Sequence, residues 1–146
     1  MVSKDYRNIV SLVGRLLLGL IFLVSAVRTA GELQASVADL AQNHVPLADI
    51  TLAIALTAEF VGAMSLVSGL WYRWGALLLI LFLVPVTLLY HAFWLYEGAR
   101  QDAQLVHFLK NLAILGGLML VAADRIRTCA LDRATPERPA RETDGR

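Results

Sequence analysis

The chain has 146 residues, of which 58% are hydrophobic and only 17% carry charge. This composition is too apolar for a soluble domain of this length, and a formal net charge of +1 gives no basis for nucleic-acid binding. The single cysteine, Cys129, excludes an internal disulfide and a CxxC redox centre, and together with three scattered histidines it predicts no zinc or other metal site.

Four apolar segments predict an all-α integral membrane protein that folds as a four-helix transmembrane bundle. Each segment is close to the ~20 residues that cross a bilayer as a helix. The helices of a soluble bundle would each show a polar stripe, and these segments show almost none. The first segment is too long for a cleavable signal peptide, so it is expected to remain as a helix. The predicted spans, within one membrane domain of residues 1–124, are about 9–29, 50–70, 75–96 and 105–123.

The charges between and beyond the spans predict the orientation. The first connecting segment, 30–49, is a polar loop with three acids and no lysine or arginine. The other side carries the basic residues Lys4, Arg7, Arg73, Arg125 and Arg127. Basic residues accumulate on the cytoplasmic side, so both termini are predicted to be cytoplasmic. Residues 125–146 hold two prolines and six arginines, which predicts a disordered basic cytoplasmic tail.

Glu59 lies in the middle of the second predicted span. A carboxyl group at that depth is costly, so it should face the protein interior and have a partner. The residues on the same helix face are Ala55, Gly62 and Ala63, and small residues of this kind allow another helix to pack closely. Glu59 is therefore a candidate proton relay.

Further polar residues are predicted to share the outer half of the membrane with Glu59. The helical rise places Glu59, His91, His107, Lys110 and Asn111 within one slab about 10 Å thick. Two more residues, Trp94 and Arg28, fall at the outer surface. The candidate ligand-binding residues are accordingly Arg28, His91, Trp94, His107, Lys110 and Asn111. In the alternative interpretation the polar residues are structural and join neighbouring helices by hydrogen bonds. Lys110 then extends to the membrane–water interface, and Trp94 anchors its helix there.

Two long-range contacts are also considered from depth alone. Glu59 and Lys110 differ in depth by only about 5 Å, which predicts a structural ion pair between the second and fourth spans. Arg15 lies on a stripe with Gly19, Phe22 and Ala26 near the inner surface. Three destinations stay open for its side chain: the inner interface, Asp124 or Glu59.

The fourth predicted span carries the most specific motif. Residues 108–117 read Phe-Leu-Lys-Asn-Leu-Ala-Ile-Leu-Gly-Gly, and the chain resembles the DoxX family of small bacterial membrane proteins in this segment. Supporting similarities are Arg15 with Gly19, Glu59 with Gly62 and Gly69, and His91 with Trp94. The resemblance covers about residues 9–124 and implies a multi-pass protein of the bacterial inner (plasma) membrane. Arg28 stands in a shifted position, where family members usually have a small residue followed by a lysine.

The resemblance also implies a range of functions, because related proteins include the small subunit of a thiosulfate–quinone oxidoreductase and a membrane component linked to redox and thiol-stress enzymes. We therefore expect a redox-associated subunit that binds a quinone-like ligand in the outer half of the bilayer. It has no built-in cofactor, so an oxidoreductase partner would supply electrons. Two alternatives stay open: a small proton-coupled transporter, for which a homodimer is expected, and a non-catalytic structural or assembly subunit.

Overall fold

The computed structural model describes residues 4–133, and every regular element in this range is helical. The elements are α1 (Lys4–Gly31), α2 (Leu33–Gln42), α3 (Ala48–Ser68), α4 (Tyr72–Tyr90), the 3₁₀ helix η1 (Phe93–Leu95) and α5 (Gly98–Arg133). Four segments are long and apolar enough to cross a membrane: Asn8–Gly31, Ala48–Ser68, Tyr72–Leu95 and Gly98–Asp124. The predicted all-α protein with four spans is confirmed, and the orientation of its termini stays a prediction.

The segment 30–49 differs from the predicted loop because it contains the helix α2. Leu40 is buried there, and α2 contacts both α3 and α1. At the end of α2 the Asn43 amide donates to the carbonyl oxygen of Asp39 across 2.9 Å. The Asp39 side chain is in turn hydrogen-bonded to Tyr90, the last residue of α4. Tertiary contacts therefore stabilise a helix that is too short and too polar to be recognised from its pattern.

The last helix is longer than predicted at both ends. It begins at Gly98 instead of residue 105, and Arg100 in its first turn stacks over the ring of Tyr96 at 4.2 Å. It also continues past the expected domain boundary at 124 as far as Arg133. A helix satisfies its backbone hydrogen bonds internally, so it can extend beyond an apolar span without a change of structure. The remainder of the predicted tail, 134–146, lies outside the described residues.

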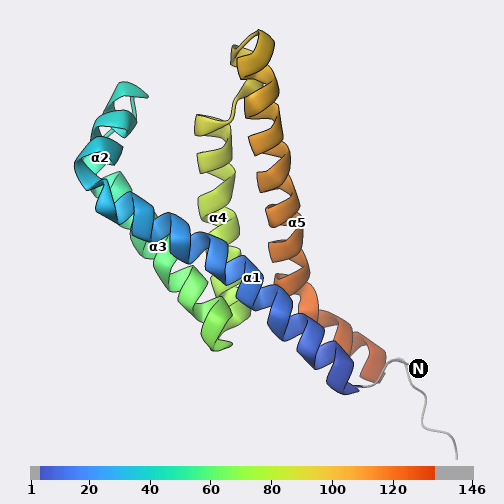
Figure 1. The fold of residues 1–146 in the computed structure, drawn as a ribbon. Coiled ribbons are helices and arrows are strands. Elements are labelled where there is room, and N and C mark those ends of the chain that lie inside the picture. Colours follow the sequence, from blue (N-terminus) through green and yellow to red (C-terminus); the bar gives the residue numbers. More distant parts are fainter. Residues whose placement is uncertain (1–3, 134–146) are drawn as a thin grey trace, which may run out of the picture.

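The helices pack in the order α1, α3, α4 and α5, as Figure 1 shows. The helix α3 lies between α1 and α4, and α5 packs along α4 and also meets α1. Over the described range, no Cα atom of α3 lies within 8 Å of one in α5. Figure 1 also shows α2 at the same end of the molecule as the α4–α5 connection, with the N-terminal end of α1 at the other.

Small residues allow the first three spans to approach closely. A Cβ atom at Gly19 would lie 3.2 Å from the Ala63 carbonyl oxygen, which places α1 against α3. On the other side of α3, a Cβ at Gly75 would lie 2.9 Å from the carbonyl oxygen of Gly62. Only glycine fits at such contacts, and the side chains beside them are fully buried, Leu66 and Leu79 among them.

Polar contacts also join the helices at the end of the bundle beside the α3–α4 connection, which is called inner below. The Arg15 guanidinium lies over the Tyr72 ring, 4.5 Å from its centroid, and the Tyr72 hydroxyl donates to Asp124 across 3.4 Å. Among the described residues Arg15 therefore forms no ion pair with Asp124 or with Glu59, and it approaches Asp124 only through Tyr72. Next to it, Arg73 Nε donates to the Ala122 carbonyl oxygen across 2.9 Å.

Candidate functional site

Glu59 is buried in the middle of α3, with 2% of its surface exposed. The predicted orientation toward other helices is confirmed, because Gly62 and Ala63 on the same face are buried too. The side chain is hydrogen-bonded to Ser25 of α1, and its Oε1 has no hydrogen-bond partner. Glu59 therefore belongs to the α1/α3 interface.

The structure does not form the predicted ion pair between Glu59 and Lys110. Lys110 lies on α5, which makes no close approach to α3, and its side chain is exposed. The two residues match in depth along their helices, but α4 separates the helices that carry them. The helical rise predicts how deep a residue lies along its own helix. It does not predict which other helix packs beside it.

Three of the predicted residues meet in the α4/α5 interface near the α4–α5 connection, the end of the bundle that is called outer below. Asn111 Nδ2 donates to Thr87 Oγ1 across 3.0 Å, and that hydroxyl donates to the Leu83 carbonyl oxygen across 2.7 Å. One turn further out, the rings of His91 and His107 stack with centroids 5.1 Å apart and planes 15° from parallel. These contacts form a polar ladder across the interface.

The outer end of this ladder is His91. Its Nδ1 lies 2.8 Å from Gln104 Oε1. An amide oxygen only accepts, so the ring donates this hydrogen bond from Nδ1. His107 is exposed beside it. Two imidazole rings therefore lie at this end of the α4/α5 interface, one turn beyond Thr87 and Asn111.

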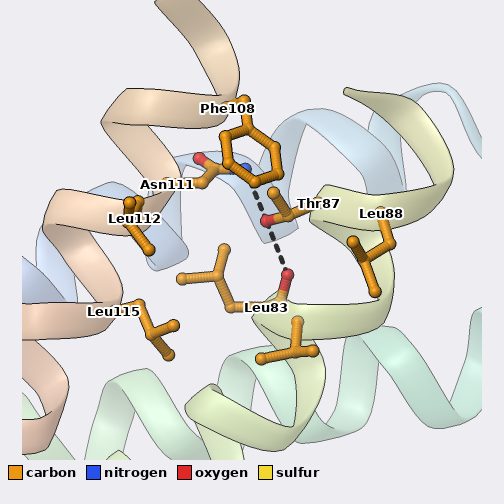
Figure 2. A pocket seen from close by; sticks show the side chains of 8 residues that line it. Leu83, Thr87, Leu88, Phe108, Asn111, Leu112 and Leu115 are labelled. Atoms are coloured by element: carbon orange, nitrogen blue, oxygen red, sulfur yellow. Dashed lines mark hydrogen bonds between the residues drawn. The ribbon is translucent and has the colours of Figure 1, made fainter. Parts of the chain in front are cut away.

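A cavity of about 100 Å³ lies directly below the ladder, between α4 and α5. Figure 2 shows Asn111 and Thr87 at one edge and leucine side chains around the rest. The residues that line it are Leu83, Val84, Thr87, Leu88, Phe108, Asn111, Leu112 and Leu115. Of these, Val84, Leu88 and Leu112 are exposed on the outside of the bundle, so the cavity opens sideways toward the bilayer.

Three aromatic rings cover the outer end of the cavity. Phe108 lines it and meets Phe93 and Trp94 of η1 edge to face, with centroids 5.4 Å and 6.0 Å away. Phe93 and Trp94 are 5.1 Å apart in the same kind of contact. Trp94 therefore contributes indirectly, by holding Phe108, and does not line the cavity itself.

The remaining predicted residues lie apart from the cavity. Arg28 is exposed in the last turn of α1, and Lys110 is exposed on α5 beside Asn111. Glu59 lies on α3, beyond α4 from the cavity. The structure thus divides the predicted constellation into an α1/α3 part and an α4/α5 part. Within residues 4–133, no group of three or more His, Cys, Asp or Glu side chains is placed to hold a metal ion.

Four residues at these two places were not predicted as site residues: Ser25, Thr87, Gln104 and Phe108. Helical spacing carried a signal for three of them. Thr87 is one turn before His91, Gln104 is three residues before His107, and Ser25 is three residues after the buried Phe22. Each is a polar residue on a face already singled out. Phe108 is the first residue of the motif at 108–117, but the motif indicated a family resemblance and not that this ring lines a cavity.

Comparison with known proteins identifies the family. The DoxX family model matches residues 10–92, which is more than half of the chain and includes most of α1 and all of α2, α3 and α4. The chain is also 25% identical over 127 residues to inner membrane protein YphA of Escherichia coli (strain K12), an alignment that covers 87% of this chain and 91% of YphA. No solved structure matches the chain.

The family match ends before α5, so it does not include the motif at residues 108–117, whereas the alignment with YphA is longer. The four apolar spans and the inner-membrane relative agree on a multi-pass protein of the inner membrane. The chain is therefore a member of the DoxX family.

Proposed function

We propose that this DoxX protein binds a quinone-like ligand in the α4/α5 cavity and serves as the membrane component of a redox system. The observation that carries the proposal is the cavity itself, whose accessible walls are apolar and whose lining residues include Phe108 and Asn111. A quinone ring needs an apolar slot and a hydrogen-bond donor at its carbonyl oxygen. The Asn111 amide nitrogen has two hydrogens, and its bond to Thr87 uses one. The accessible walls of the cavity are apolar, so the proposal requires the Asn111 side chain to turn its second hydrogen toward the ligand carbonyl.

The volume of the cavity limits what part of a ligand it takes. About 100 Å³ is enough for the edge of a ring. Pockets that enclose a whole drug-sized ligand measure ~300–1,000 Å³. A long tail would have to leave through the side opening past Val84, Leu88 and Leu112 into lipid. This geometry favours a lipid-soluble ring compound with an apolar chain.

The polar ladder supplies the second part of the proposal. His91 and His107 lie one turn outward from Thr87 and Asn111, about 6 Å along the helices. Reduction of a quinone requires protons, and imidazoles at this position can pass them from the outer surface. Electrons would come from a partner oxidoreductase. Glu59, predicted as the relay, lies across α4 from the cavity, so the histidine pair takes that role in the proposal.

The orientation belongs to the same proposal. With both termini cytoplasmic, the ladder, η1 and α2 face the periplasm. Cysteine placed at Asp39 on α2 should then react with a membrane-impermeant thiol reagent in intact cells, whereas cysteine placed at Ser68 at the opposite end of α3 should not. The reverse pattern would turn the cavity toward the cytoplasm.

A titration with a short-chain quinone in nanodiscs tests the binding. Wild type should bind saturably. Asn111→Leu should weaken binding at least tenfold, because it replaces the amide donor with an apolar side chain of similar size. Gly116→Ala is the matched control on the same helix, since a Cβ there meets no atom within 4 Å, and it should bind like wild type.

The second candidate function is a structural or assembly subunit. It is favoured by one observation: Asn111 with Thr87, His91 with Gln104, and Arg73 with the Ala122 carbonyl all join α4 to α5. Contacts of this kind can serve packing alone. Absence of saturable binding by wild type, or equal binding by Asn111→Leu, would favour this function over the first.

A further inference from the structure

The α1/α3 interface contains a buried acid that the proposed function does not use. Glu59 is 2% exposed, and it lies eleven residues into a 21-residue helix, about 16 Å from the start of α3. The residues that line the α4/α5 cavity belong to other helices, so the surroundings of Glu59 can be considered independently.

The neighbours of Glu59 provide a hydrogen bond but no counter-charge. Ser25 of α1 is bonded to the carboxyl group, and Oε1 has no partner. The relative positions of α1 and α3 explain why. Gly19 packs on Ala63 and Arg15 reaches Gly69, so successive contacts run antiparallel and place Ser25 beside Glu59.

The charged and titratable groups of the packed elements lie elsewhere. On α1, Arg15 is at the inner end against Tyr72 and Arg28 is exposed in the last turn. On α2, Asp39 is bonded to Tyr90 of α4. The charged residue of α4, Arg73, donates a hydrogen bond to the Ala122 carbonyl oxygen. Within residues 4–133 none of these groups forms an ion pair with Glu59.

An ionised carboxylate at this depth would lack both water and a cation. A buried charge without compensation is much more costly than a buried neutral group, and such a group becomes neutral instead. We propose that Glu59 and Ser25 form a proton-binding site between α1 and α3, in which Glu59 holds a proton as a neutral carboxylic acid while the protein lies in the bilayer at neutral pH.

The roles of the two side chains follow from their chemistry. The Ser25 hydroxyl donates to one carboxyl oxygen of Glu59, and the other oxygen is the place for the bound proton. Ser25 is itself at the exposed side of α1, whereas Glu59 lies behind it. Ser25 is therefore the residue of the site that is exposed at the surface of the bundle.

Infrared spectroscopy of the whole protein in nanodiscs at neutral pH tests the proposal. Wild type should show the carbonyl stretch of a protonated carboxylic acid, and isotope-labelled glutamate should move it. Glu59→Gln should remove this band. Ser25→Ala should keep the band but shift it to higher frequency, because the carbonyl loses its hydrogen bond. Glu97→Gln changes an exposed glutamate and is the matched control, which should leave the band unchanged.

Several results would overturn the proposal. A wild-type spectrum without the band means that Glu59 is ionised. Loss of the band on addition of sodium chloride means that a metal cation replaces the proton. If Glu59→Gln fails to fold, the Ser25→Ala shift decides alone, and an unshifted band contradicts the site. None of these outcomes depends on quinone binding, so failure here and failure of the proposed function are distinguishable.

Discussion

The two faces of α4 are packed according to different principles. Toward α3, Gly75 meets Gly62 and Ser65 so closely that backbones approach each other, and Ala76 and Leu79 are fully buried. Toward α5, the same helix offers Thr87 and His91 to polar partners and leaves a cavity beside them. One face packs closely against α3, and the other borders the cavity in which we propose that a ligand binds. In this proposal the close packing and the binding site lie on opposite sides of one helix.

The largest expected effect comes from disturbing the close face. Gly75→Ala should lower the free energy of unfolding by about 1–3 kcal/mol, because the new methyl group would lie 2.9 Å from the Gly62 carbonyl oxygen. Unfolding in detergent measures it. Gly116→Ala is the control, because the space around that glycine is open and alanine favours the helix. Equal stability of the two variants would show that the close approach is not rigid.

An effect of similar size is expected from the aromatic cover of the cavity. Phe108→Leu should lower the free energy of unfolding by about 0.5–1.5 kcal/mol for each edge-to-face ring pair that it removes, with Phe93 and with Trp94. It should also accelerate release of a bound quinone, measured by stopped-flow dilution. Phe60→Leu replaces a phenylalanine that is 51% exposed and should change neither quantity. A stable Phe108→Leu variant with unchanged release would exclude Phe108 as a cover.

The hydrogen bonds of the polar ladder should contribute less to the free energy of unfolding than the ring contacts do. A double-mutant cycle with Asn111→Leu and Thr87→Val should give a coupling energy of about 0.6 kcal/mol, the average for hydrogen bonds between membrane helices. Thermal unfolding of the four proteins supplies the cycle. Strictly additive losses would mean that the 3.0 Å hydrogen bond contributes no stability.

The smallest effect is expected at the inner end. Tyr72→Phe removes the long 3.4 Å hydrogen bond to Asp124 but keeps the ring beneath Arg15. The change in stability should be below about 0.5 kcal/mol, as for most exposed substitutions. A destabilisation several times larger would show that this hydrogen bond, and not the close packing of α3 with α4, holds the inner end together.

The sequence was sufficient to predict features that depend on one helix at a time. Span number follows from apolar length, and burial of Glu59 follows from Gly62 and Ala63 on the same face. It was not sufficient for features that depend on which helices are neighbours. Lys110 is at a suitable depth but on a helix that α4 separates from Glu59.

The sequence also did not show in which direction around its helix each polar side chain points relative to the neighbouring helices. Lys110 and Asn111 are adjacent in sequence, yet successive residues point about 100° apart around an α-helix. Asn111 therefore meets Thr87 while Lys110 is exposed. The helix α2 was missed for a different reason, because its stability depends on contacts such as Asp39 with Tyr90 that no local pattern contains.

The bond between Asp39 and Tyr90 has a structural consequence. Tyr90 and His91 are consecutive residues at the end of α4, so one short stretch is tied on one side to α2 and on the other to Gln104 of α5. The surface helix α2 is thereby linked to the residues beside the cavity through the end of a single helix, although α2 and the cavity lining share no residue.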